Sequence, residues 1–252
     1  MVFTSYIFAE NIPVPLVPSS IKGYVYYYNN FDNSSGKAEI NKWNIKEEIN
    51  PFLITNNGLI GKGFLSNSKN GIVLKSSALS PDEPITISVW WKLKNPYKTS
   101  ESKSFGFGIF SFIGKGYISC FIRSGGKGGW CGLKEPAGVF QVQNFKRIND
   151  INGIYNTDAV KLLNLKRLQW HNTIITFSNG MYIRLYQDGK KVGEWGLNSP
   201  FNKNDGIKTL QFGFSDEVLS QIVIFNKNIS SEEVEEYYNM MKGLKETLSF
   251  GN

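Results

Sequence analysis

The chain has 252 residues, a length that suits one large domain or two small ones and can bury a core without metal or disulfide support. Hydrophobic residues are 41% and charged residues 19% of the total, which excludes bulk disorder. No uncharged apolar stretch approaches the roughly 18 residues that a membrane span needs, so we expect no membrane insertion. The net charge is +7, but 24 of the 28 basic residues are lysines. Because arginine makes the bidentate contacts of nucleic-acid readers, we expect no specific nucleic-acid partner.

The first twenty residues carry Pro13, Pro15 and Pro18, with apolar residues between them. This spacing favours an extended arm over 1–20 that seeks a groove, either on its own domain or on a partner. The first ten residues lack the basic and apolar regions of a secretory signal. No signal peptide is therefore visible, and the chain is either a mature form or leaves the cell by another route.

From Gly23 onward the chain alternates short apolar strands with turns. In 85–93, apolar residues occupy the odd positions, and Thr86, Ser88, Trp90 and Lys92 occupy the even ones. We therefore expect Trp91 to be buried and Trp90 to lie on the polar side. Asp188-Gly189 predicts a tight hairpin because both central residues of a type I′ turn need a positive φ. The predicted strands are 24–28, 71–75, 85–93, 105–113, 117–122, 171–177, 182–186, 210–214 and 221–225.

Two segments between these strands leave alternatives open. A two-residue hairpin at Gly125-Gly126 would place Cys120 opposite Cys131, where either a cross-strand disulfide or two free thiols would fit. The stretch 144–168 has no clear period and predicts an irregular excursion.

One helix is predicted, at the C-terminal end. Ser230 and Glu233 form a capping box, and apolar residues at helical spacing follow until a stop near Gly243. Many strands and one short helix predict an all-β, two-sheet antiparallel sandwich.

Several ordered pieces resemble the laminin G-like, concanavalin A-like lectin-glucanase jelly-roll family over about 21–242. The pieces are 23–36 with its Asp-Asn-Ser-Ser-Gly loop, 61–65 with 71–74, Ile-Thr-Ile-Ser-Val-Trp at 85–90, Trp170-His171 with Tyr-Gln-Asp-Gly-Lys at 186–190, and 222–225 with 229–233. The resemblance implies a jelly-roll sandwich with a concave face and rim loops. We expect one such domain over 21–252, preceded by the arm 1–20.

The residues offer no catalytic centre. Glycosidases need two carboxyl groups roughly 5–9.5 Å apart, and no strand carries the alternating acidic triplet that would supply them. His171 is the single histidine and has a structural place in the resemblance, and two cysteines with one histidine cannot make a usual zinc site. We therefore expect no enzyme activity.

The candidate binding residues are of two kinds: aromatic side chains for sugars, and oxygen-bearing side chains in loops for calcium. Flat aromatic faces bind sugars, and the candidates at loops or on the polar side of a strand are Trp43, Trp90, Tyr97 and Trp130. Calcium is the one cofactor considered, through loop oxygens of Asp32, Asn33, Asp216 and Glu217, although 32–36 also suits an ordinary turn.

These expectations favour a non-catalytic recognition or adhesion module that binds a glycan or a surface protein. The alternative is a structural subunit of a virion, such as a phage capsid or tail protein, with the arm 1–20 docked on neighbouring subunits. Both place the chain outside the cell or on a particle surface.

Overall fold

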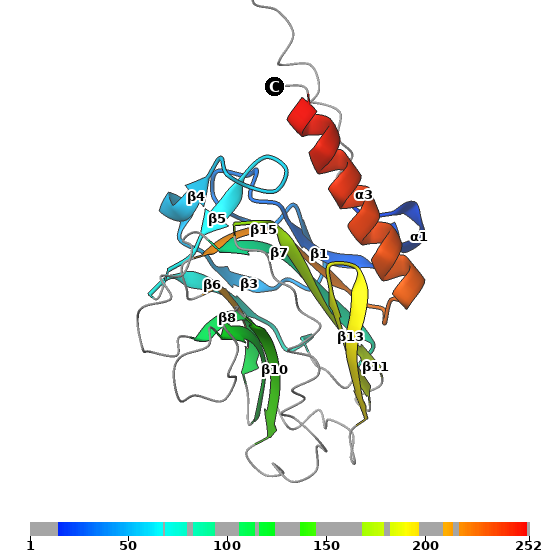
Figure 1. The fold of residues 1–252 in the computed structure, drawn as a ribbon. Coiled ribbons are helices and arrows are strands. Elements are labelled where there is room, and N and C mark those ends of the chain that lie inside the picture. The colour runs from blue at the N-terminus through cyan, green and yellow to red at the C-terminus, as the bar shows by residue number, and fades with distance from the viewer. Residues whose placement is uncertain are drawn as a thin grey trace, which may run out of the picture.

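The computed structural model describes residues 15–67, 69–79, 83–93, 106–113, 116–123, 137–144, 168–178, 182–196, 209–213 and 217–250. Within these residues, β-strands dominate and helices are few (Figure 1). The elements are α1 (Ser19–Lys22), β1 (Val25–Asn29), β2 (Ile40–Asn41), β3 (Lys46–Glu48), the 3₁₀ turn η1 (Pro51–Leu53), β4 (Ile54–Thr55), β5 (Gly63–Leu65), β6 (Gly71–Lys75), β7 (Ile85–Leu93), β8 (Gly106–Ile113), β9 (Gly116–Arg123), β10 (Ala137–Asn144), β11 (His171–Ser178), β12 (Tyr182–Gln187), β13 (Lys190–Gly196), β14 (Thr209–Gly213), β15 (Glu217–Phe225) and α3 (Ser231–Phe250).

The strands form two antiparallel sheets. The larger has nine strands in the order β13-β12-β11-β7-β15-β1-β2, with β5 on β15 and β4 on β5. The smaller has six strands in the order β10-β9-β8-β14-β6-β3. This arrangement confirms the predicted all-β, two-sheet antiparallel sandwich with one C-terminal helix.

The core between the sheets contains alternate residues of strands such as β6, β7, β11 and β12. On β7 the inward residues Ile85, Ile87, Val89 and Trp91 are almost wholly buried, as the alternation predicted. The Trp91 indole Nε1 donates a hydrogen bond to Thr173 Oγ1 at 2.9 Å, so its polar atom is satisfied inside the core. The expected burial of Trp91 is therefore confirmed.

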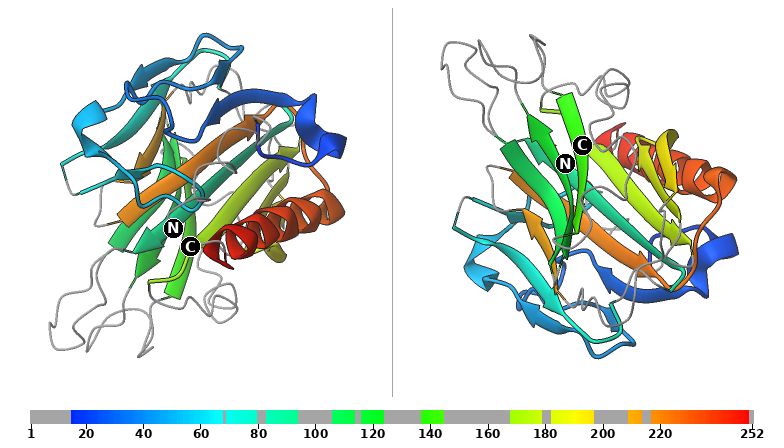
Figure 2. Two further views of the ribbon diagram at one scale, coloured as in Figure 1. Left: turned by 90° about the horizontal axis from the view of Figure 1, so that it is seen from above. Right: turned by 90° about the horizontal axis from the view of Figure 1, so that it is seen from below.

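A second apolar layer covers the outer face of the larger sheet, where α3 and α1 lie side by side (Figure 2). It contains Trp90, Tyr237 and Met241 together with Leu16 and Val17 of the N-terminal segment. The polar side of β7 is consequently not a solvent-facing surface. Alternation within one strand does not reveal this, because a helix from the end of the chain supplies the cover.

The C-terminal helix begins as predicted but runs further. Ser230 N donates to Glu233 Oε2 at 2.8 Å and Glu233 N donates to Ser230 Oγ at 3.3 Å, which confirms the capping box. The predicted stop at Gly243 is wrong, since α3 continues to Phe250. One glycine costs a helix only about 1 kcal/mol, too little to end it when good helix formers follow. Among the described residues, no helix is long and apolar enough to cross a membrane.

The end of the predicted arm packs on the chain's own sandwich. Leu16 and Val17 are buried, and Gln221 Nε2 donates to the Leu16 carbonyl at 3.2 Å. The chain is helical from Ser19, so the last residues of 1–20 are not extended. Residues 1–14 lie outside the described residues.

The hairpin predictions have mixed outcomes. Asp188 and Gly189 have φ values of 51° and 79° and join β12 to β13, as predicted. Cys120 lies opposite Phe140 of β10, so the prediction of a two-residue hairpin that faces Cys120 with Cys131 is wrong. The return strand begins only at Ala137, and Cys131 lies outside the described residues. Of the predicted excursion 144–168, only its two end residues are described.

Candidate functional site

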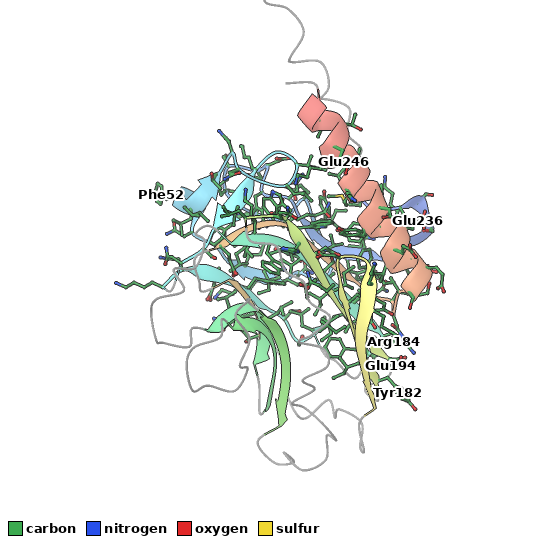
Figure 3. All side chains as sticks on the ribbon, viewed as in Figure 1. Phe52, Tyr182, Arg184, Glu194, Glu236 and Glu246 are labelled. Carbon is green, nitrogen blue, oxygen red and sulfur yellow. The ribbon has the colours of Figure 1, made fainter. Side chains whose placement is uncertain are left out.

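An open hollow of about 460 Å³ lies beside β2 and β3, at one end of the smaller sheet. This volume is within the roughly 300–1,000 Å³ of small-molecule sites. Its lining mixes one carboxylate, one ammonium, amides and two isoleucines, and consists of Ser35, Gly36, Lys37, Asn41, Asn44, Ile45, Glu47 and Ile49. The next turn, η1, carries Phe52, which projects on the opposite side of the molecule from Glu236 and Glu246 of α3 (Figure 3).

Glu47 is held in a fixed position in this hollow. Its Oε1 accepts hydrogen bonds from the Tyr27 hydroxyl at 2.8 Å and from the Ala38 backbone N–H at 3.0 Å. Burial, followed by the charge of Glu47, raises the pKa of Tyr27 well above its usual value. Tyr27 is therefore a neutral donor at all ordinary pH values, and the carboxylate is oriented before any ligand arrives.

Asn29 ties this carboxylate to the turn that forms the other wall. Its Nδ2 donates to the Gly36 carbonyl at 2.7 Å and lies 3.4 Å from the Tyr27 hydroxyl. Gly36 has a φ of +72°, and a Cβ there would lie 2.9 Å from Cγ2 of Ile49. The wall therefore requires glycine, both for its backbone conformation and for its close approach to Ile49.

Asn41 closes the floor through its own side chain. Its Oδ1 accepts from the Ile45 N–H at 2.7 Å, and its Nδ2 donates to the Ile45 carbonyl at 2.8 Å. Both polar atoms of Asn41 are thus committed to the loop. Three lining side chains keep unused polar capacity, because no hydrogen bond to another described residue occupies Lys37 Nζ, the Asn44 amide or Glu47 Oε2.

The two described aromatic candidates, Trp43 and Trp90, lie in different surroundings. Trp43 lies between Asn41 and Asn44 in the sequence. Its side chain is half-buried and packs against Tyr26, with ring centroids 4.9 Å apart. Trp90 is only 2% exposed and stacks on Tyr238 beneath α3, so its face is occupied by the protein itself. Tyr97 and Trp130 lie outside the described residues. Trp43 is therefore the described candidate that remains next to an open site.

Of the predicted calcium ligands, Asp32 and Asn33 form local hydrogen bonds and Glu217 is buried. Asp32 Oδ2 accepts from Asn30 Nδ2 at 2.7 Å, and Asn33 Oδ1 accepts from the N–H and hydroxyl of Ser35, as in an ordinary Asx turn. Glu217 is wholly buried at the start of β15, and Asp216 lies outside the described residues. In the part of the chain that the structure describes, no three His, Cys, Asp or Glu side chains come together to hold a metal.

The hollow suits binding better than hydrolysis. Glu47 is the one carboxylate in its lining, whereas glycoside hydrolysis uses two carboxyl groups across the scissile bond. Glu48, the next residue, lies on the other face of β3 and pairs with Lys75 at 2.7 Å. His171 lies 2.7 Å from Asp188 and against the Trp91 ring, on β11, which β7, β15 and β1 separate from β2 in the larger sheet.

Glu47 did not emerge from the sequence. β3 has three residues, Lys-Glu-Glu, and no apolar alternation marks it as a strand. The position of Glu47 depends on Tyr27, twenty residues earlier, through a contact between the two sheets. The asparagines in the loops near Glu47 were the one local signal, because asparagine is common in turns.

No protein-family model matches the sequence, and no curated protein matches it significantly. The fold is nevertheless shared with solved structures. The binding domain of Paraclostridial Mosquitocidal Protein 1 aligns with a TM-score of 0.57 and 15% identity over 86% of this chain and 52% of that chain. The binding domain of botulinum neurotoxin serotype D gives 0.55 and 14% over 89% and 52%. Domain 4 of AbnA, a GH43 extracellular arabinanase from Geobacillus stearothermophilus in complex with arabinotriose, gives 0.57 and 15% over 84% and 97%.

These similarities establish the fold. The chain spans about half the length of the toxin binding domains and nearly the whole of the arabinanase domain. Two of them are described as binding domains, and the third as domain 4 of an arabinanase in complex with arabinotriose. They confirm the all-β sandwich fold, whereas the laminin G-like assignment itself stays a prediction.

Proposed function

We propose that this chain is a carbohydrate-binding module and that the hollow between 35 and 49 is its ligand site. Glu47 is the observation that carries the proposal. A lining carboxylate with one oxygen fixed by two neutral donors and the other without a hydrogen bond from a described residue is able to accept a hydrogen bond from a ligand hydroxyl.

Two features of the surroundings support a sugar. The isoleucines Ile45 and Ile49 offer apolar patches for the C–H faces of a ring, and Lys37 and Asn44 offer donors at the rim. Structures of the same fold include one described with arabinotriose and another described with N-acetylneuraminic acid. The extracellular arabinanase domain suggests that this chain also acts outside the cell.

The particle-subunit alternative rested on docking of residues 1–20 to a neighbour. Leu16 and Val17, which lie in the described part of that segment, instead belong to the apolar layer on the chain's own sandwich, so this part gives docking no support. A surface protein as ligand rests on no comparable site among the described residues.

The test is titration calorimetry with arabinotriose and with N-acetylneuraminic acid, comparing the wild type with Glu47→Gln. The amide keeps an acceptor for Tyr27 and Ala38, so we expect the melting temperature to change little. Loss of the charge should weaken binding of the neutral sugar arabinotriose about tenfold or more, as for a hydrogen bond to a charged group. Glu48→Gln, on the other face of the same strand, is the matched control and should bind like the wild type. Undiminished binding by Glu47→Gln would exclude the hollow as the site.

A further inference from the structure

The hollow contains two ionisable side chains whose charges are not equivalent. Glu47 is half-buried, and its Oε1 is fixed by Tyr27 and Ala38. Lys37 is exposed at the rim, and none of the described carboxylates pairs with it. A fixed, partly desolvated charge acts strongly on a ligand, whereas an exposed lysine is screened by water and salt. The field inside the hollow is therefore set mainly by Glu47.

The contacts of Glu47 leave its negative charge uncompensated. Both partners of Oε1 are neutral donors, and no ion pair to Glu47 occurs among the described residues. Glu48, in contrast, lies 2.7 Å from Lys75 and 3.9 Å from Lys46. One residue apart on the same strand, one carboxylate is paired with cations and the other is presented unpaired to the hollow.

An ionised carboxylate is an acceptor only, so a ligand must bring a donor to Oε2. A sugar hydroxyl does this at no electrostatic cost. A second carboxylate, as in a uronic or sialic acid, would place two like charges in one partly desolvated site, where one of them is strongly disfavoured in its ionised form. Ile45 and Ile49 on the remaining wall cannot offset that repulsion.

We infer that Glu47 makes the hollow selective for neutral sugars and excludes sugars that carry a carboxylate at the ring bound there. This inference rests on the proposed function and assigns its ligand class. Glu47 is then both the acceptor for the ligand hydroxyl and the residue that determines specificity.

The test uses ligand pairs that differ only by a hydroxymethyl group or a carboxylate, namely galactotriose with trigalacturonic acid and cellotriose with its uronic acid counterpart. Titration calorimetry of the wild type should show the neutral member of a bound pair at least about tenfold tighter. Glu47→Gln should lower the ratio of neutral to acidic affinity to about two or below, because its oxygen stays with Tyr27 and Ala38 and the uncharged NH₂ that replaces Oε2 does not repel the acid. Glu48→Gln should keep the wild-type ratio.

Three outcomes would overturn the inference. Equal or tighter binding of the acidic member by the wild type, reduced in Lys37→Gln, would assign selectivity to the lysine and leave the proposed function standing. A preference for the neutral member that persists in Glu47→Gln would assign the selectivity to another residue of the chain and would also leave the proposed function standing. If neither these ligands, arabinotriose nor N-acetylneuraminic acid binds, the proposed function fails together with the inference.

Discussion

The indole of Trp90 and the phenol ring of Tyr238 stack with centroids 5.6 Å apart and planes 7° apart. This contact joins the middle of the larger sheet to α3, and it turns a residue on the nominally polar side of β7 into part of a core. Ser88 and Thr86, on the same side of the strand, are buried with it.

Replacing Trp90 by Ala should therefore affect stability and not sugar recognition. We expect a loss of about 3–5 kcal/mol in the free energy of unfolding, as for other large-to-small core substitutions. Trp90→Phe, which keeps a ring against Tyr238, should lose clearly less. Urea unfolding followed by fluorescence measures both variants. A fully stable Trp90→Ala that no longer binds sugar would show that the ring serves a ligand.

The N-terminal segment provides a second stability test. Chains lacking residues 2–14 and residues 2–20 differ in whether Leu16 and Val17 can pack beneath α3. Burial of two such side chains is worth about 3 kcal/mol or more, so the longer deletion should melt at a clearly lower temperature than the shorter one. Leu16→Ala in the full chain controls for effects of shortening. Equal melting temperatures of the two shortened chains would contradict this packing.

Buried tyrosines should make the fold sensitive to alkali. Burial raises the pKa of Tyr28 to about 12, and it also raises the pKa of Tyr237. A group with a raised folded-state pKa contributes stability that is complete below its unfolded value, near 10, and is lost as the pH rises through the folded value. We expect the free energy of unfolding to fall by about 2–3 kcal/mol per such tyrosine between pH 10 and 12. Tyr28→Phe should flatten this fall, and an identical alkaline profile would count against the assignment.

Gly36 tests whether the shape of the hollow matters. An added methyl group would meet Cγ2 of Ile49 at 2.9 Å and would force a φ of +72° on alanine, at a cost of about 1–3 kcal/mol. We expect Gly36→Ala to lower both the melting temperature and sugar affinity. Gly243→Ala is the control, because nothing lies within 4 Å of the added methyl group in α3 and alanine favours a helix. Equal effects of the two substitutions would show that Gly36 has no special role.

The sequence predicted those elements whose information is local. Alternation located β7 and placed Trp91 in the core, and the residue pairs Asp188-Gly189 and Ser230-Glu233 located a hairpin and a helix start. Each of these signals depends on backbone preference or on a few neighbouring residues.

The parts that were missed depend on distant partners. Nothing within β7 indicates that Trp90 is covered, because its cover is Tyr238 of α3. The apolar residues at helical spacing in α3 indicated only that one face of this helix packs against another part of the protein. Glu47 was missed for the same reason, since its role is set by Tyr27 of the other sheet and by the turn at Gly36.

The outer layer also has a consequence for synthesis of the protein. Leu16 is held by Gln221, and Ser20 Oγ donates to Glu236 at 2.9 Å, so contacts that complete this layer span more than two hundred residues. A chain emerging from the ribosome can pair its early strands but cannot bury Trp90 or Leu16 until α3 has left the exit tunnel. During that interval the outer face of the larger sheet lacks part of its apolar cover, and we expect a chaperone to bind the nascent chain there.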